Sequence, residues 1–109
     1  MTGATGRDQL VKRLNSSIGR PPQDDYEWQY LDTRVRTLAG IGAAVCNGAS
    51  EPTYARLVDA ALLAGANADD VLATLLCIAD IAGGPRVVTA APGIAKALHY
   101  DIEGALERD

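Results

Sequence analysis

The chain has 109 residues, a length that fits one domain with a modest hydrophobic core. Hydrophobic residues make up 48% of it, but aromatic residues only 5% with no Phe, so small aliphatic side chains must fill that core. The formal net charge of −4 argues against a nucleic-acid-binding protein, and the sequence contains no apolar run long enough to span a membrane.

The N-terminal part of the chain predicts a short tail, one helix and a linker. We expect residues 1–6 to be a disordered tail. They lack the basic and apolar regions of a signal peptide, which predicts a cytoplasmic protein. Apolar residues at helical spacing predict a helix over residues 8–19. Residues 20–27 are a predicted linker, because no helix interior tolerates the Pro21-Pro22 pair.

Two helices are predicted in the middle of the chain. The first runs from residue 31 to about residue 47, and its Gly40 and Gly42 make sense if another helix packs closely against them. After a turn, Pro52 suits the first turn of the next helix, which we expect to end at Gly65.

The helix predicted over residues 68–82, with Asn67 as its N-cap, is apolar nearly all round. Beyond its first turn we expect no solvent face, so this should be a central helix buried against the rest of the fold and against a second subunit. A Gly-Gly pair ends it and Pro85 opens the last helix, whose apolar residues continue at helical spacing to Ile102. Pro92 within this helix predicts a kink or a split. Because no period-two pattern occurs, the predicted fold class is all-α.

The two cysteines, Cys46 and Cys77, each lie in an apolar helical context. Buried free thiols are the favoured interpretation, with a redox role as the alternative. One histidine and scattered acids do not supply metal ligands at useful spacing, so we expect no metal and no cofactor.

Asp80 lies in the middle of the otherwise apolar helix. A buried carboxylate must be paired, hydrogen-bonded or protonated. The favoured interpretation is a salt bridge to Arg34, Arg36 or Arg86, and the alternative is an acid in a pocket or at a subunit interface.

Three stretches between residues 31 and 98 carry a family resemblance. They read LDTRVRTL at residues 31–38, ALLAG followed by DDV within residues 61–71, and GGP at residues 83–85. In this order and spacing they resemble the carboxymuconolactone decarboxylase family, which includes the AhpD-like alkylhydroperoxidases. The resemblance implies a single domain over residues 1–109 with its family core at 31–98, folded as an AhpD-like orthogonal bundle of about five to six helices. It also implies a homo-oligomer, a trimer or a hexamer.

The reactive positions of that family are occupied by other residues here. Aligned on Gly65, the peroxidase branch's Cys-x-x-Cys falls on Ser50 and Thr53, its histidine on Leu57, and its upstream glutamate near Thr37. A peroxidase of this type needs a thiolate close to a base, so the alignment argues against peroxidase activity.

Two functions follow from the resemblance. The first is a divergent decarboxylase-like lyase that acts on or binds a small carboxylated or lactone compound. In this hypothesis Arg36 and Arg34 hold the anion, while Asp80, His99 and Tyr54 are the candidates for proton transfer. The second is a non-catalytic member of the family, an oligomeric scaffold that binds a small ligand or a protein partner.

Each of these residues also has a structural interpretation. Arg36 could form an ion pair with Asp32 one turn earlier, which weighs about equally with anion binding. His99 is more often a surface residue when it stands alone, and Tyr54 is more often a tyrosine at the edge of a core.

Overall fold

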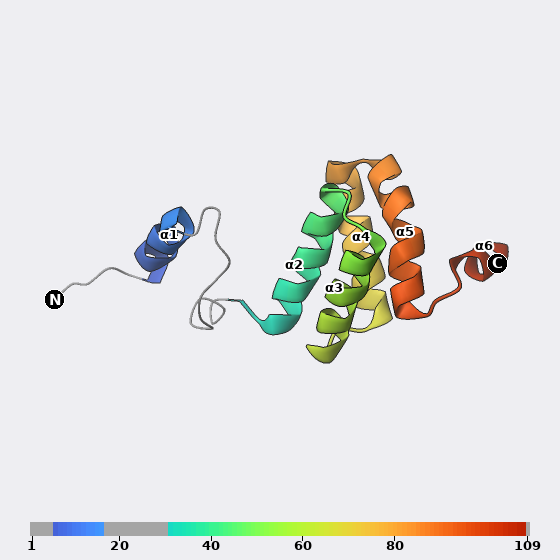
Figure 1. Cartoon of the computed structure of the whole chain (residues 1–109), viewed down its shortest axis with the longest axis horizontal. Coiled ribbons are helices and arrows are strands. Elements are labelled where there is room, and N and C mark those ends of the chain that lie inside the picture. The colour runs from blue at the N-terminus through green and yellow to red at the C-terminus, as the bar shows by residue number, and fades with distance from the viewer. Residues whose placement is uncertain (1–5, 17–30, 109) are drawn as a thin grey trace. The chain divides into compact units, whose positions relative to one another are not determined.

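The computed structural model describes residues 6–16 and 31–108, so the predictions for residues 1–5 and for the linker at 20–27 lie outside the described residues. Contacts between Cα atoms divide the chain into two compact units, residues 1–31 and 32–109, and each is described by itself. Within the described ranges the structure contains six helices and no strand (Figure 1), which confirms the all-α fold class. The single domain and the AhpD-like arrangement stay predictions.

The first unit contains α1 (Gly6–Ser16), which begins two residues before the predicted helix. Its apolar side chains Leu10, Val11 and Leu14 are exposed. None of the helices described is both long and apolar enough to cross a lipid bilayer.

The second unit contains α2 (Thr33–Cys46), α3 (Glu51–Leu63), α4 (Ala68–Ala82), α5 (Gly84–Leu98) and α6 (Ile102–Glu107). The predicted end of α3 and the predicted start of α4 are confirmed. Gly65 follows α3 with φ +98°, a conformation that glycine adopts without strain. Asn67 and Asp70 form a reciprocal capping box at the start of α4, each side chain accepting a hydrogen bond from the other residue's backbone N–H.

Helix α5 runs unbroken through Pro92, so the predicted split at this residue is wrong. The helix ends instead at Leu98, because His99 adopts a left-handed conformation with φ 55°. Ile102, which was expected to continue the last helix, begins the separate helix α6.

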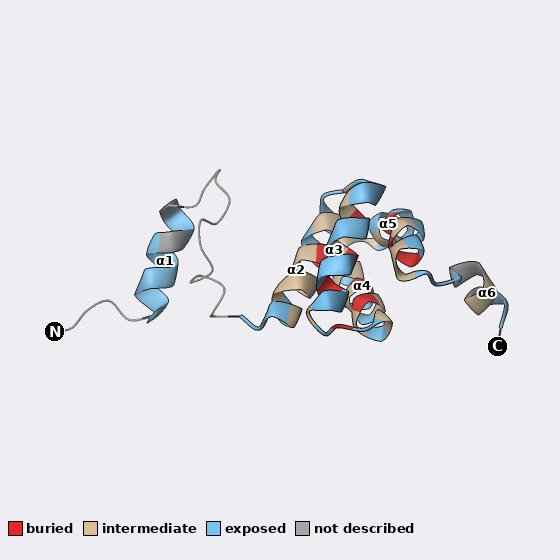
Figure 2. Cartoon of the chain, turned by 60° about the horizontal axis from the view of Figure 1, so that its bottom comes forward, coloured by how far each residue is buried: buried red, intermediate tan, exposed pale blue. Residues whose placement is uncertain are grey.

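Four of these helices enclose one core. α2 packs against α3 and α4, and α5 completes the ring by packing against the other sides of α3 and α4. The buried residues lie on the inner sides of these helices, as Figure 2 shows. The largest fully buried side chains are those of Ile41, Val45, Val58, Val71 and Ile94. The core is thus built from aliphatic residues of modest size, as the composition predicted.

Helix α4 differs from its prediction. Within one chain Val71 and Leu75 are buried, but Leu76 is 77% exposed and Ile81 is 84% exposed. The physical reason is that α4 packs mainly against α2 and α5, and these two neighbours leave its outer side uncovered. The predicted burial against the rest of the fold is confirmed only for the inner side of α4, and its burial against a second subunit stays a prediction.

The two glycines of α2 have different surroundings. Gly42 is buried, and a Cβ atom at this position would lie 3.4 Å from a methyl group of Ile78. A Cβ atom at Gly40 would meet no atom within 4 Å. The predicted close approach of another helix is therefore confirmed at Gly42, and Gly40 has no such role within the chain.

Candidate functional site

The most apolar concavity of the second unit is an open groove of about 590 Å³ between α2 and α4. The two helices run in the same direction, because residues at the start of α2 face the start of α4 and Gly42 lies against Thr74 and Ile78. Apolar side chains form most of the groove walls, among them Val35 and Leu38 from α2 and Ile81 from α4. Such a surface suits an apolar partner better than a polar one.

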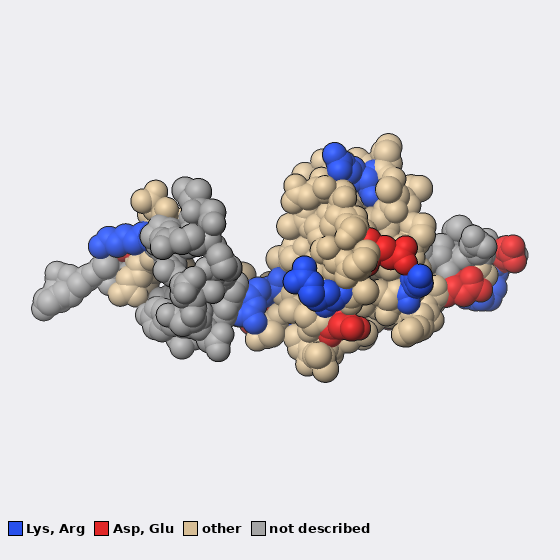
Figure 3. Space-filling view, viewed as in Figure 1, with Lys and Arg blue, Asp and Glu red and all other residues tan. Residues whose placement is uncertain are grey.

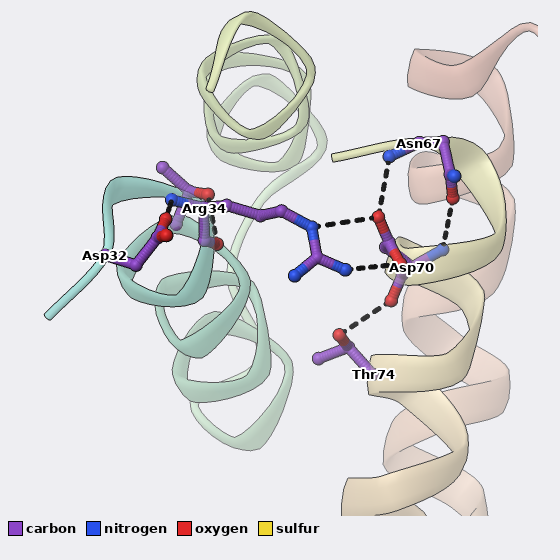
Figure 4. Close-up of polar contacts among 6 residues, drawn as sticks. Asp32, Arg34, Asn67, Asp70 and Thr74 are labelled. Carbon is purple, nitrogen blue, oxygen red and sulfur yellow. Dashed lines mark hydrogen bonds and ion pairs between the residues drawn. The ribbon is translucent and has the colours of Figure 1, made fainter. Parts of the chain in front are cut away.

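The groove is polar at one end, where an ion pair joins the two helices. Arg34 donates from Nε and Nη2 to the two carboxylate oxygens of Asp70, at 3.2 and 2.7 Å. Figure 4 shows the guanidinium reaching across from α2 to the first turn of α4. Asp70 also accepts from the backbone N–H of Asn67, and the Thr74 hydroxyl donates to the Asp70 carbonyl oxygen. The ion pair is thus part of the cap of α4.

These contacts shift both titrating groups toward their charged forms. The hydrogen bond from Arg34, followed by that from the Asn67 backbone, lowers the pKa of the Asp70 carboxyl below its usual value. The hydrogen bond to Asp70 in turn raises the pKa of the Arg34 guanidinium. Both groups are therefore charged at neutral pH, and neither is poised to exchange a proton. Arg34 was predicted to bind substrate, and its pairing with Asp70 was not predicted.

Both cysteines line this groove, Cys46 from α2 and Cys77 from α4. They are free and exposed, so the prediction of buried thiols is wrong. Both cysteines do lie in apolar helices, but each is on the side of its helix that the chain leaves uncovered.

Asp80 is exposed on the outer side of α4, which corrects the expectation of a buried carboxylate. Arg34, one of its three predicted partners, pairs with Asp70 instead. An exposed carboxylate is solvated by water and needs no partner, so the reason for expecting a perturbed acid at this position is removed within one chain.

The other candidate residues lie apart from one another. Tyr54 is buried on α3, and its ring lies against Gly93 of α5, where a Cβ atom would approach the ring within 3.2 Å. Tyr54 lines a pocket of about 290 Å³ together with Arg86. His99 is exposed at the end of α5 and lines a different pocket. Arg36 is half-buried on α2.

The pocket that contains His99 has a volume of about 510 Å³ and lies between α3 and α5, with charged residues in its lining. Its charged residues include Glu51 and Lys96, whose side chains form an exposed ion pair at 2.8 Å. The hydrogen bond to Glu51 raises the pKa of the Lys96 ammonium, which keeps this group protonated. An exposed pair of this kind contributes little to stability and does not prepare a base for catalysis.

The positions aligned with the family's reactive residues have structural roles here. The hydroxyl oxygens of Ser50 and Thr53 lie 3.1 Å apart in one hydrogen bond at the start of α3. Leu57 packs against the buried core. Thr37 donates a hydrogen bond to the carbonyl oxygen of Arg34 in the preceding turn of its own helix.

The catalytic constellation that the sequence suggested is thus not assembled in one chain. Arg34, Tyr54 and His99 line three different pockets, and Asp80 and Arg36 line none of these three. Within residues 6–16 and 31–108, no three His, Cys, Asp or Glu side chains gather closely enough to hold a metal ion. On the face of the second unit seen in Figure 3, basic and acidic side chains form small separate groups among uncharged residues.

Comparison with known proteins adds no relative: no family model matches the chain, and no curated protein and no solved structure does either.

Proposed function

We propose that this chain is a non-catalytic helical module that associates with a second copy of itself through the outer sides of α2 and α4. We call this surface the α2–α4 face and define it by its exposed apolar residues, which are Val35, Ala39, Ala43, Cys46, Ala73, Leu76, Cys77 and Ile81. In terms of the family resemblance, the chain would keep the oligomeric scaffold of the carboxymuconolactone decarboxylase type and would lack its chemistry.

The main support for the proposal is the exposure of large aliphatic side chains on α4. Leu76 and Ile81 are 77% and 84% exposed, and both lie on the helix that forms one wall of the apolar groove. Single exposed apolar residues are common on protein surfaces, whereas contiguous apolar patches mark interaction sites. Here the exposed residues of the α2–α4 face other than Leu76 line the groove between two adjacent helices, and Leu76 lies one turn after Ala73 on α4, so they form one patch.

The charges of the two helices favour a second copy as the occupant. Helix α2 contains two arginines and no acidic residue, while α4 contains three aspartates and no basic residue. A two-fold axis running along the groove places α2 of each copy against α4 of the other. Arg34 and Asp70 already form an ion pair within each chain, but Asp69 and Asp80 leave α4 with a net negative charge opposite the basic helix α2, which favours this pairing over one between like-charged helices.

The homo-oligomer predicted from the resemblance was a trimer or a hexamer. A two-fold contact of this kind can form a dimer, or it can be one of the contacts in a hexamer that contains two-fold axes. The proposal specifies the contact and leaves the number of subunits as a prediction.

Binding of a small carboxylated compound in the same groove is the second candidate. It is favoured by the position of Arg34 at the polar end of an otherwise apolar concavity of about 590 Å³, a size within the usual range for ligand pockets. In this case Arg34 would hold the carboxylate and the groove would hold the apolar part of the ligand.

The mass of the full chain in solution tests the proposal. Sedimentation velocity over a roughly hundredfold range of concentration should show a dimer or a multiple of it. Ile81→Glu should yield monomers, because Ile81 lines the groove and the variant places one carboxylate from each copy in an apolar interface. Leu63→Glu is the matched control, since Leu63 is 90% exposed at the end of α3 and does not line the groove. A monomeric wild-type chain, or equal effects of the two variants, would refute the proposal.

A further inference from the structure

The two thiols of the chain lie on the α2–α4 face. Cys46 belongs to α2 and Cys77 to α4, both are free and exposed, and both line the groove between these helices. The sequence contains no other cysteine, so a disulfide can join only these two positions, within one chain or between copies. Which of these bonds can form depends on the level and the direction of each thiol along the groove.

The packing of α2 on α4 sets the levels of the two thiols. A Cβ atom at Gly42 would lie 3.4 Å from a methyl group of Ile78 and 3.8 Å from that of Thr74, so Gly42 is level with the turn between them. Cys77 lies within that turn, and Cys46 follows Gly42 by four residues along a helix that runs in the same direction. The two thiols therefore differ in level by about one helical turn, roughly 5 Å.

Within one chain the two thiols point away from their shared helix contact. The side of α4 that touches α2 lies between Thr74 and Ile78, and Cys77 is set roughly 80° around the helix from its centre. Cys46 is exposed, whereas Gly42 at the contact is buried. A disulfide requires Cβ atoms about 3.8 Å apart that are directed toward each other. Both thiols instead face outward, toward the place of the second copy.

The proposed two-fold axis places the two kinds of cysteine opposite each other. An axis along the groove keeps every residue at its own level, so Cys46 of each copy faces α4 of the other copy within about one turn of the partner's Cys77. Ala43 and Ala73, each exposed one turn before a cysteine, are small enough to let the helices of the two copies approach closely. Such an approach is needed for a disulfide, whose Cα atoms lie about 5.5–6 Å apart.

We propose that the α2–α4 face is a site of reversible oxidation, at which Cys46 forms a disulfide with the partner's Cys77 and a small-molecule disulfide, glutathione disulfide, is the oxidant. The thiolate of one cysteine attacks a sulfur atom of glutathione disulfide, which forms a mixed disulfide and releases glutathione. The opposing cysteine then attacks the protein sulfur of the mixed disulfide and releases the second glutathione. Two protein thiols are thus oxidised while one glutathione disulfide is reduced.

The bond would convert a concentration-dependent association into a covalent one that a reductant reverses. Two-fold symmetry forms it twice in each dimer. This inference rests on the proposed association, because the two thiols meet only when α2 of one copy lies against α4 of the other.

Oxidation of the full chain with glutathione disulfide, followed by denaturing electrophoresis without reductant, tests the inference. A covalent dimer should become the main product, and dithiothreitol should return it to the monomer. Mass spectrometry of a tryptic digest should show residues 37–56 joined to residues 57–86, each of which contains one cysteine. Ile81→Glu keeps both cysteines but separates the copies, so it should lose most of the covalent dimer at the same protein concentration.

Two serine variants decide the pairing. Cys46→Ser and Cys77→Ser each leave one kind of cysteine, and neither should form a covalent dimer alone. An equimolar mixture of the two variants should form it, because Cys77 of the first meets Cys46 of the second. Both positions are exposed, so circular dichroism should show the wild-type fold. A covalent dimer in either variant alone, or joined peptides in a product with the mass of one chain, would overturn the inference.

Sedimentation velocity of the reduced chain separates a failure of this inference from a failure of the proposed association. A reduced chain that associates but gives no covalent dimer on oxidation overturns the disulfide alone. A reduced chain that remains monomeric refutes the association, and the disulfide with it.

Discussion

Replacement of Ile81 by alanine is the most quantitative test of association through the α2–α4 face. Ile81 lines the groove and is 84% exposed in the single chain, so its side chain can contribute little to folding and much to an interface. Alanine also has a higher helix propensity than isoleucine, so the variant should fold at least as well as the wild-type chain.

The expected magnitude follows from the exposed area. The substitution removes three carbon atoms worth about 0.8 kcal/mol each when buried, and the 84% exposure in the free chain makes their burial in an interface worth roughly 2 kcal/mol per copy. A two-fold interface contains the residue twice, so the loss is roughly 4 kcal/mol per dimer. The dissociation constant should therefore rise about a thousandfold.

Sedimentation equilibrium of the full chain measures this constant directly. Leu63→Ala is the control, because it removes the same number of carbon atoms from a side chain that is 90% exposed and lies outside the groove. It should leave the dissociation constant unchanged. Urea unfolding, followed by circular dichroism at concentrations where the chain is monomeric, should show similar stabilities for both variants.

The reasoning would be refuted if Ile81→Ala changed the dissociation constant by less than about tenfold, since the exposed side chain would then not be buried on association. It would equally be refuted if Leu63→Ala had the same effect, because the interface would then not be the α2–α4 face.

Three further predictions concern the fold of the second unit. The hydrogen bond from Arg34 lowers the pKa of Asp70 below the ordinary 3.8, so the ionised carboxylate stabilises the fold above that pH and the stabilisation is lost as the pH falls through the lowered pKa. Melting temperatures in acid should show that Asp70→Asn removes this part of the pH dependence. Gly40→Ala should stabilise the fold by about 0.5–1 kcal/mol in urea unfolding, because its Cβ atom meets nothing within 4 Å and alanine favours the helix. Ile94→Ala should destabilise the fold by about 2–5 kcal/mol in the same assay, because this fully buried side chain leaves a cavity in the core.

Each of these predictions has an outcome that contradicts it. An unchanged acid dependence in Asp70→Asn would show that the ion pair does not couple to folding. A loss of stability in Gly40→Ala would show that another surface approaches this glycine. A loss well under 1 kcal/mol in Ile94→Ala would mean that the core around α5 is not packed as described.

The sequence predicted the helices well because their signals are local. Asn67 was recognised as an N-cap, and its capping box depends on a residue only three positions away. Gly65 was recognised as the end of α3 because its positive φ is a property of that residue type. The end of α5 was missed because a left-handed histidine at residue 99 has no comparable signal.

The candidate site was predicted less well because its geometry depends on residues far apart in the chain. Arg34 pairs with Asp70, thirty-six positions away, and no pattern around either residue indicates this. Arg86 was considered only as a partner for Asp80, whereas the structure places it beside Gly48 and in one pocket with Tyr54. Which charged and polar groups meet is decided by the packing of the helices.

The sequence by itself determined that this protein is helical, where most of its helices begin and end, and that small aliphatic residues form its core. These properties follow from side-chain periodicity, capping and backbone preference, which act over a few residues. Only the tertiary structure decided which side of each apolar helix is covered. Helix α4 is apolar on nearly all sides, so its sequence cannot distinguish Leu75, buried in the core, from Leu76, exposed on the α2–α4 face. That distinction depends on where α2 and α5 lie around α4, and it is the basis of the proposed association.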